Sequence, residues 1–83
     1  MTYDIAFKSR SIKDLQSIPK SMAERILDRI EAMREDLAGD VKRLTNFTPE
    51  YRLRVGEYRI LFEVESDTIV IYRVKHRSNA YGP

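Results

Sequence analysis

A chain of 83 residues is long enough for one small domain and no more, so we expect a single domain over residues 1–83. The net charge of +2 comes from 15 basic and 13 acidic side chains, and the 83 residues include no cysteine and one histidine. This composition excludes disulfides, thiol catalysis and cysteine zinc sites, and it suits a reducing cytosol. No secretory signal and no apolar run of membrane-spanning length is recognisable. We therefore expect a soluble cytoplasmic protein without a metal or another cofactor.

The first half of the chain predicts a short strand followed by two helices. Residues 3–7 alternate between apolar and polar side chains, as a strand does. A helix then runs from a serine cap to Pro19. A second helix begins with a capping box at residues 21–24 and ends at Gly39. Its apolar side chains recur at helical steps of three and four: Met22, Ile26, Ile30, Met33 and Leu37.

The second half predicts three strands: 51–55, 58–64 and 69–75. A connection over residues 40–50 precedes them, and we expect its Leu44 and Phe47 to reach the core. The order β-α-α-β-β-β is an α+β fold, with two N-terminal helices packed on one face of a mainly antiparallel four-stranded sheet. Because one helix pair covers one face, the other face must meet water or a ligand.

The first hairpin indicates which side chains face the helices. With a two-residue type II′ turn that begins at Gly56, one face carries Arg54 directly opposite Arg59, with Arg52 beside them. Like charges across an antiparallel pair destabilise it by about 0.2–1 kcal/mol. The other face pairs apolar and aromatic side chains and is therefore the core face: Tyr51 with Phe62, Leu53 with Ile60, and Val55 with Tyr58.

The second turn admits two registers. A two-residue loop would place Arg73 opposite Ile60 in the core, where an unpaired guanidinium is costly. A three-residue loop over residues 65–67 instead puts Arg73 opposite Arg59 and leaves Lys75 on the same face, so we expect this register. The helix-free face and the strand end beyond it then gather a set of basic residues: Arg52, Arg54, Arg59, Arg73, Lys75, His76 and Arg77.

Two interpretations of these cations are open. Arginines on exposed sheet faces are common, and Glu57, Glu63 or Glu65 could neutralise some of them. Few carboxylates share this face, however, and arginine binds phosphate bidentately while remaining charged. The pattern therefore favours a polyanion site, although it does not distinguish binding from cleavage.

Two segments give the chain a more specific resemblance: YRLRVGEYRILFEV at 51–64 and IYRVKHRSNAY at 71–81. Together with the helical segment IPKSMAERILDRI and the element order, they resemble the RelE/ParE toxin superfamily of type II toxin–antitoxin systems. The terminal HRSNAY favours the RelE branch, which is described as cleaving messenger RNA in the ribosomal A site. The resemblance implies a metal-independent endoribonuclease in which the 2′-hydroxyl attacks the adjacent phosphate. It also implies a hetero-oligomeric complex with a small, acidic, partly disordered antitoxin.

The resemblance implies roles for residues on the strands. The alternating basic residues of the RelE motif match Arg52 and Arg54, and a basic residue of the next strand matches Arg59. Arg54 would hold the phosphate in line, and Arg59 would stabilise the charge that develops on the phosphorane. Arg52 and Arg73 would bind the RNA backbone.

The end of the chain supplies the remaining candidates. Lys75 or Arg77 matches the basic residue after the last strand, and Tyr81 matches a terminal aromatic that stacks on a base. The best-described RelE members have lysines where this chain has its alternating arginines, and arginine cannot accept a proton. His76 is therefore the candidate general base or acid, and a structural strand-end histidine is the equally weighted alternative. Two other functions stay open, namely a ParE-like DNA gyrase inhibitor and a noncatalytic RNA-binding protein.

Overall fold

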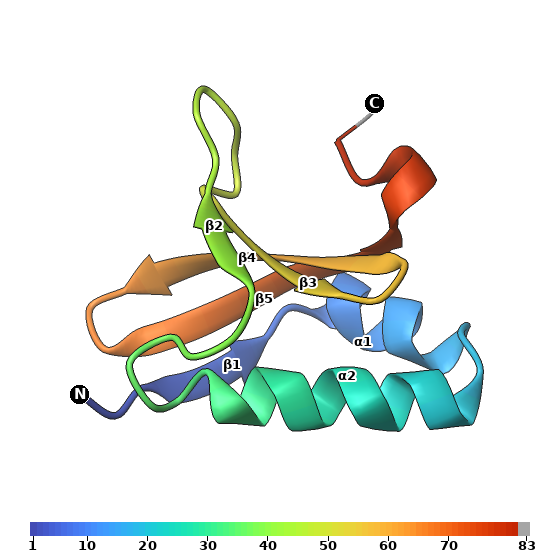
Figure 1. The fold of residues 1–83 in the computed structure, drawn as a ribbon, viewed down its shortest axis with the longest axis horizontal. Coiled ribbons are helices and arrows are strands. Elements are labelled where there is room, and N and C mark those ends of the chain that lie inside the picture. The colour runs from blue at the N-terminus through green and yellow to red at the C-terminus, as the bar shows by residue number, and fades with distance from the viewer. Residues whose placement is uncertain (82–83) are drawn as a thin grey trace.

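The computed structural model describes residues 1–81. Its elements occur in this order: β1 (Asp4–Phe7), α1 (Ser9–Gln16), α2 (Lys20–Ala32), β2 (Val41–Arg43), β3 (Tyr51–Val55), β4 (Tyr58–Glu65), β5 (Thr68–His76) and the short 3₁₀ helix η1 (Arg77–Asn79). One sheet contains the strands in the order β1-β5-β4-β3-β2, with β1 parallel to β5 and the other pairs antiparallel. The helices lie on one side of the sheet, whereas the β2–β3 loop and the chain end rise from the other (Figure 1). The α+β fold class is therefore confirmed.

The sheet has five strands rather than the expected four. The additional strand, β2, pairs with β3 and places Lys42 opposite Arg52. Backbone hydrogen bonds join the two segments just beyond the strand: Arg54 N–H donates to the Asp40 carbonyl at 3.0 Å and Leu44 N–H to the Glu50 carbonyl at 2.6 Å. Three residues are too few for alternation to distinguish a strand from a loop, which explains why the sequence predicted a connection here.

The helix boundaries also differ from those expected. Neither helix has a side-chain cap at its N-terminus. α2 begins at Lys20, so the expected capping box at 21–24 lies inside the helix. The helix ends at Ala32 rather than at Gly39, and the turn that follows contains two residues with left-handed backbone conformation: Asp36 (φ 54°) and Leu37 (φ 57°).

The core lies between α2 and the inner face of the sheet. α2 and the turn after it contribute Ile26, Ile30 and Met33, and strands β3–β5 contribute the rest: Leu53, Val55, Ile60, Phe62, Ile69, Ile71 and Val74. Full burial of one such side chain is worth about 1.5–3 kcal/mol. All four residue pairs predicted for the first hairpin are confirmed. Because a slip of one residue would turn arginines into this core, the apolar face specifies that register.

The register expected for the second hairpin is wrong. The loop has two residues, 66–67, and a β-bulge in the middle of the strand pair then shifts the pairing by one residue. As a result Lys75, not Arg73, lies opposite Arg59, and Arg73 lies opposite Leu61. The sequence argument correctly excluded Arg73 from the core. The fold meets that requirement with a bulge rather than with a longer loop.

Candidate functional site

A cavity of about 550 Å³ opens on the sheet face that the helices leave uncovered. Strands β2, β3 and β4 supply four cations, and the β2–β3 loop and the chain end supply apolar and aromatic walls. Figure 1 shows these two segments rising from the same side of the sheet. Within residues 1–81 the lining contains no Asp or Glu side chain, and the lining residues in this part of the chain are Lys42, Leu44, Thr45, Phe47, Arg52, Arg54, Arg59 and Tyr81.

Arg54 and Arg59 lie opposite each other in the β3–β4 pair, where both line the cavity. Arg59 Nη1 donates to the carbonyls of Gly56 and Tyr58, each at 3.0 Å, so its guanidinium is held at the turn. Within residues 1–81, neither arginine forms an ion pair. Their charges are therefore available to an anion in the cavity.

Arg52 lines the same cavity but is tethered at the edge of the sheet. Its Nη1 donates to the Asp40 carbonyl at 2.7 Å and to Asp40 Oδ1 at 3.2 Å. The Arg52 side chain is only 14% exposed, whereas that of Asp40 is 57% exposed. Arg52 is thus fixed in position and partly neutralised, in contrast to Arg54.

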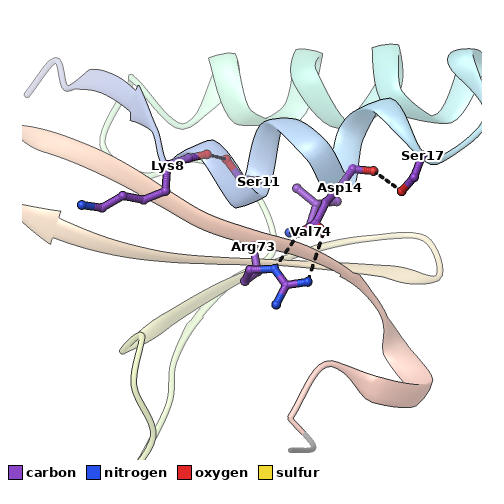
Figure 2. A network of polar contacts seen from close by, with 6 residues as sticks. All are labelled: Lys8, Ser11, Asp14, Ser17, Arg73 and Val74. Atoms are coloured by element: carbon purple, nitrogen blue, oxygen red, sulfur yellow. Dashed lines mark hydrogen bonds and ion pairs between the residues drawn. The ribbon is translucent and has the colours of Figure 1, made fainter.

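Arg73 lies outside the cavity and ties α1 to β5 (Figure 2). Its Nε and Nη2 donate to Asp14 Oδ2 at 2.8 Å and Oδ1 at 3.1 Å, and Val74 N–H donates to Oδ2 at 2.9 Å. Burial alone would raise the pKa of Asp14. The hydrogen bonds from Arg73 and Val74, with the charges of Arg73 and Arg10, outweigh burial and hold that pKa below its ordinary value. The same carboxylate raises the pKa of Arg73. The Arg73 guanidinium is therefore already paired with an anion inside the protein.

Three other predicted site residues lie near the cavity but do not line it. Lys75 is on the same face, opposite Arg59. His76 pairs with Tyr58 at the strand end, where their rings meet edge-on at 5.7 Å, and its Nδ1 accepts the Ser78 N–H at 3.2 Å. Arg77 Nε is 3.6 Å from Glu57 in an exposed ion pair.

Tyr81 closes the cavity from the chain end. Its ring meets the ring of Phe47 nearly perpendicularly, with centroids 5.5 Å apart. The preceding Ala80 is buried, whereas Tyr81 is 46% exposed. The backbone is therefore anchored while much of the aromatic side chain stays accessible.

Sequence reasoning missed the contribution of the β2 region. It took residues 40–50 as a connection and expected Leu44 and Phe47 to reach the core, but both line the cavity instead. Lys42 enters the site because β2 pairs with β3 and places it opposite Arg52. A three-residue strand carries no periodic signal, so the sequence offers no pattern that would have identified Lys42.

Within residues 1–81, no group of three or more His, Asp or Glu side chains is placed to hold a metal ion. None of the helices in this part of the chain is both long and apolar enough to cross a membrane. What the cavity offers is positive charge, guanidinium and ammonium donors, and two aromatic rings. Such groups bind phosphates and stack on bases.

The fold and cavity define a small α+β protein that presents an arginine-rich site on the free face of its sheet. Residues 5–81 match the family described as the ParE toxin of type II toxin–antitoxin systems, parDE. The chain therefore belongs to the RelE/ParE toxin superfamily, and it is the toxin of such a system.

Similar proteins agree with this assignment. The toxin RelE3 of Methanocaldococcus jannaschii is 38% identical in an alignment 82 positions long that covers 93% of this chain and 93% of the relative. The RelB–RelE antitoxin–toxin complex from Methanococcus jannaschii contains a chain with a TM-score of 0.76 and 36% identity, covering 92% of this chain and 94% of that one. The archaeal RelE–RelB complex from Pyrococcus horikoshii contains a chain with a TM-score of 0.71 and 30% identity. The match covers 96% of this chain and 100% of that one. Both structures were solved with an antitoxin present.

Proposed function

We propose that this toxin is a ribosome-dependent endoribonuclease of the RelE type, which cleaves messenger RNA in the A site and thereby inhibits translation. The observation that carries the proposal is the cavity, where Arg52, Arg54, Arg59 and Tyr81 gather and where no Asp or Glu of the described residues 1–81 contributes to the lining. Relatives named RelE support the same branch. Cleavage would take place in the cytoplasm, where ribosomes are found.

The proposed reaction is metal-independent transesterification. The RNA 2′-hydroxyl attacks the adjacent phosphorus, and the 5′-oxygen leaves, so that a 2′,3′-cyclic phosphate remains. Negative charge grows on the phosphorane oxygens, and cations that are already in place stabilise it where it develops. Arg54 and Arg59 have no acidic partner within residues 1–81, which suits them to this role. Arg52 steers the RNA backbone, and Lys75 or Arg77 adds charge beside the cavity.

His76 is our candidate for the proton transfer, since histidine is the side chain that ordinarily titrates near neutral pH. In the unbound fold its Nδ1 accepts the Ser78 N–H, so Nε2 is the nitrogen left to exchange a proton with RNA. His76→Gln should therefore slow cleavage on programmed ribosomes while leaving ribosome binding intact. Unchanged cleavage by the variant would eliminate this role and leave His76 as the cap of η1.

The partner we propose is a small, acidic, partly disordered antitoxin that folds onto the toxin in a hetero-oligomeric complex. Solved relatives were crystallised with RelB. We expect the antitoxin to cover the basic cavity or to displace the chain end around Tyr81, because either change removes the site. A structure of the complex in which both stay untouched would refute this mode of neutralisation.

Inhibition of DNA gyrase is the second candidate function, and the match to the ParE family favours it. Purified toxin added separately to a translation reaction and to a gyrase reaction distinguishes the candidates. Cleavage of messenger RNA at codon positions supports the proposed function, whereas DNA breaks that require gyrase support the alternative. If neither occurs, a noncatalytic RNA-binding role remains.

A further inference from the structure

Phe47 was expected in the core, yet it lines the cavity together with Arg54 and Arg59. We propose that Phe47 supplies a second aromatic wall, next to Tyr81, for one nucleobase of single-stranded RNA, beside the phosphate held by these arginines. The inference rests on the RNA substrate of the proposed function. It adds Phe47, on the β2–β3 loop, as a positioning residue that the sequence motifs do not contain.

The geometry of the two rings leaves room for a base. Their planes are 85° apart with centroids at 5.5 Å, so the edge of one ring meets one face of the other. The contact between the two rings therefore covers only one of the four ring faces. Tyr81 is 46% exposed, and Phe47 is half-buried, so neither ring is sealed inside the protein.

The β2–β3 loop that carries Phe47 is closed at its base by Glu50. The Glu50 carboxylate accepts from Arg43 Nε at 3.1 Å and Nη2 at 2.8 Å. The Glu50 carbonyl accepts the Leu44 N–H at 2.6 Å, and the Glu50 N–H donates to Glu63 Oε2 at 3.0 Å. The loop is thereby tied to the sheet, which presents Phe47 in a fixed place and lowers the ordering cost of binding.

The opposite wall is anchored as well. Ala80 is 2% exposed, and Arg77 N–H donates to the Glu57 carbonyl at 2.7 Å. The burial of Ala80 and this hydrogen bond together hold the segment before Tyr81 in place. The two aromatic rings thus project from separately anchored segments, meet each other, and line the same cavity as the cations.

The chemistry of the cavity favours a nucleotide over a peptide. Cations that suit phosphate lie on the strands, and two aromatic rings that suit a base lie on the walls. Among the residues that the structure describes, no Asp or Glu lines the cavity to repel RNA. The volume of about 550 Å³ falls in the range of small-molecule sites. Stacking of a base on an aromatic ring is worth about 1–3 kcal/mol and tolerates any base sequence.

The test measures binding of a fluorescent single-stranded RNA whose riboses are 2′-O-methylated, which prevents cleavage, by anisotropy. A second oligonucleotide has one abasic position, moved along the strand in a series. Phe47→Leu should weaken binding of the intact RNA by roughly 5- to 150-fold, the equivalent of the stacking energy. Phe47→Tyr should bind as the wild type does. Phe7→Leu is the matched control, because Phe7 is an exposed phenylalanine at the end of β1 and does not line the cavity.

At one position of the series, the abasic RNA should bind wild-type toxin as weakly as intact RNA binds Phe47→Leu. The two losses should not add, because they remove the same contact. Unchanged binding by Phe47→Leu, additive losses at every position, or no RNA binding by the wild type would overturn the inference. If Phe47→Leu weakened binding of the antitoxin but not of RNA, the inference would also be overturned, because the site would then accept a peptide. Normal base-dependent binding without cleavage on ribosomes would contradict the proposed function alone.

Discussion

The cross-strand pairing of Arg54 with Arg59 allows effects on function and on stability to be separated. In the wild type, Arg59 faces Arg54 on one side and Lys75 on the other. Each like-charge pair costs about 0.2–1 kcal/mol. Arg54→Gln removes one of these pairs and breaks no ion pair within residues 1–81. We therefore expect it to raise the free energy of unfolding by about 0.2–1 kcal/mol.

Arg59→Gln has a different balance. It removes both repulsions, worth about 0.4–2 kcal/mol together, but it also removes the hydrogen bonds to the Gly56 and Tyr58 carbonyls. Each of these bonds contributes about 0.5–1.5 kcal/mol. The two bonds together, about 1–3 kcal/mol, match or outweigh the relieved repulsion, so Arg59→Gln should leave the free energy of unfolding unchanged or lower it by up to about 2 kcal/mol. The double variant should be at least as stable as Arg59→Gln.

Urea unfolding of the four proteins, followed by circular dichroism, yields the coupling energy between the two arginines. The coupling should be unfavourable in the wild type at low salt and should shrink at 1 M salt, where the Debye length falls to about 3 Å. Messenger RNA cleavage should be lost in all three variants. A decrease of more than about 1 kcal/mol for Arg54→Gln would refute the reasoning, because the arginine would then serve the fold.

The remaining predictions concern stability. Asp14→Asn should lower the free energy of unfolding by about 1–3 kcal/mol, because Arg73 and Val74 lose their shared acceptor charge at a site that is partly exposed. The pKa of Asp14 is lowered in the fold, so its contribution is present above pH about 4 and is lost as the pH falls through the folded pKa. Acid titration of the unfolding free energy should accordingly be steeper for the wild type than for Asp14→Asn; equal slopes would contradict the assignment. Gly56→Ala should lower the free energy of unfolding in urea by about 1–2 kcal/mol, because alanine is strained at φ +57°. A steric clash does not add to this cost, because the new Cβ would lie at an ordinary 3.7 Å from Arg25 Nη1. An unchanged free energy of unfolding would show that the turn relaxes.

The first hairpin was predictable because two independent signals agree. Alternation separates Arg54 and Arg59 from the apolar side chains, and Gly56 supplies the positive φ that a two-residue turn needs. A wrong register would bury charge, so no competing arrangement satisfies the sequence.

The second hairpin was not predictable in the same way. Its bulge lies next to a tertiary contact that no local pattern encodes, because Asp14 of α1 binds both Arg73 and the Val74 N–H. The sequence argument weighed turn lengths and did not include an inserted residue in the strand. Helix ends were missed for a related reason, because α2 is held by the core rather than by a cap.

The sequence predicted the cations of the candidate site as a group. It did not predict which of them line the cavity and which are paired elsewhere in the fold. Alternation placed Arg52, Arg54 and Arg59 together, and the fold gathers them at one cavity. Pairing with a distant carboxylate removes Arg73 from that group, and such pairing is visible only after α1 has docked. Lys42 and Phe47 enter through a strand and a loop whose positions follow from sheet pairing rather than from periodicity.

The most direct test of the proposed function is the fate of one 2′-hydroxyl. Programmed ribosomes would carry a messenger RNA in the A site, in one preparation with ribose throughout and in another with a single 2′-deoxyribose at the scissile nucleotide. Purified toxin should cleave the first and leave a 2′,3′-cyclic phosphate, whereas the second should stay intact. Cleavage of the deoxy-substituted RNA at the same bond would contradict attack by the 2′-oxygen, and an intact all-ribose RNA would contradict ribonuclease function altogether.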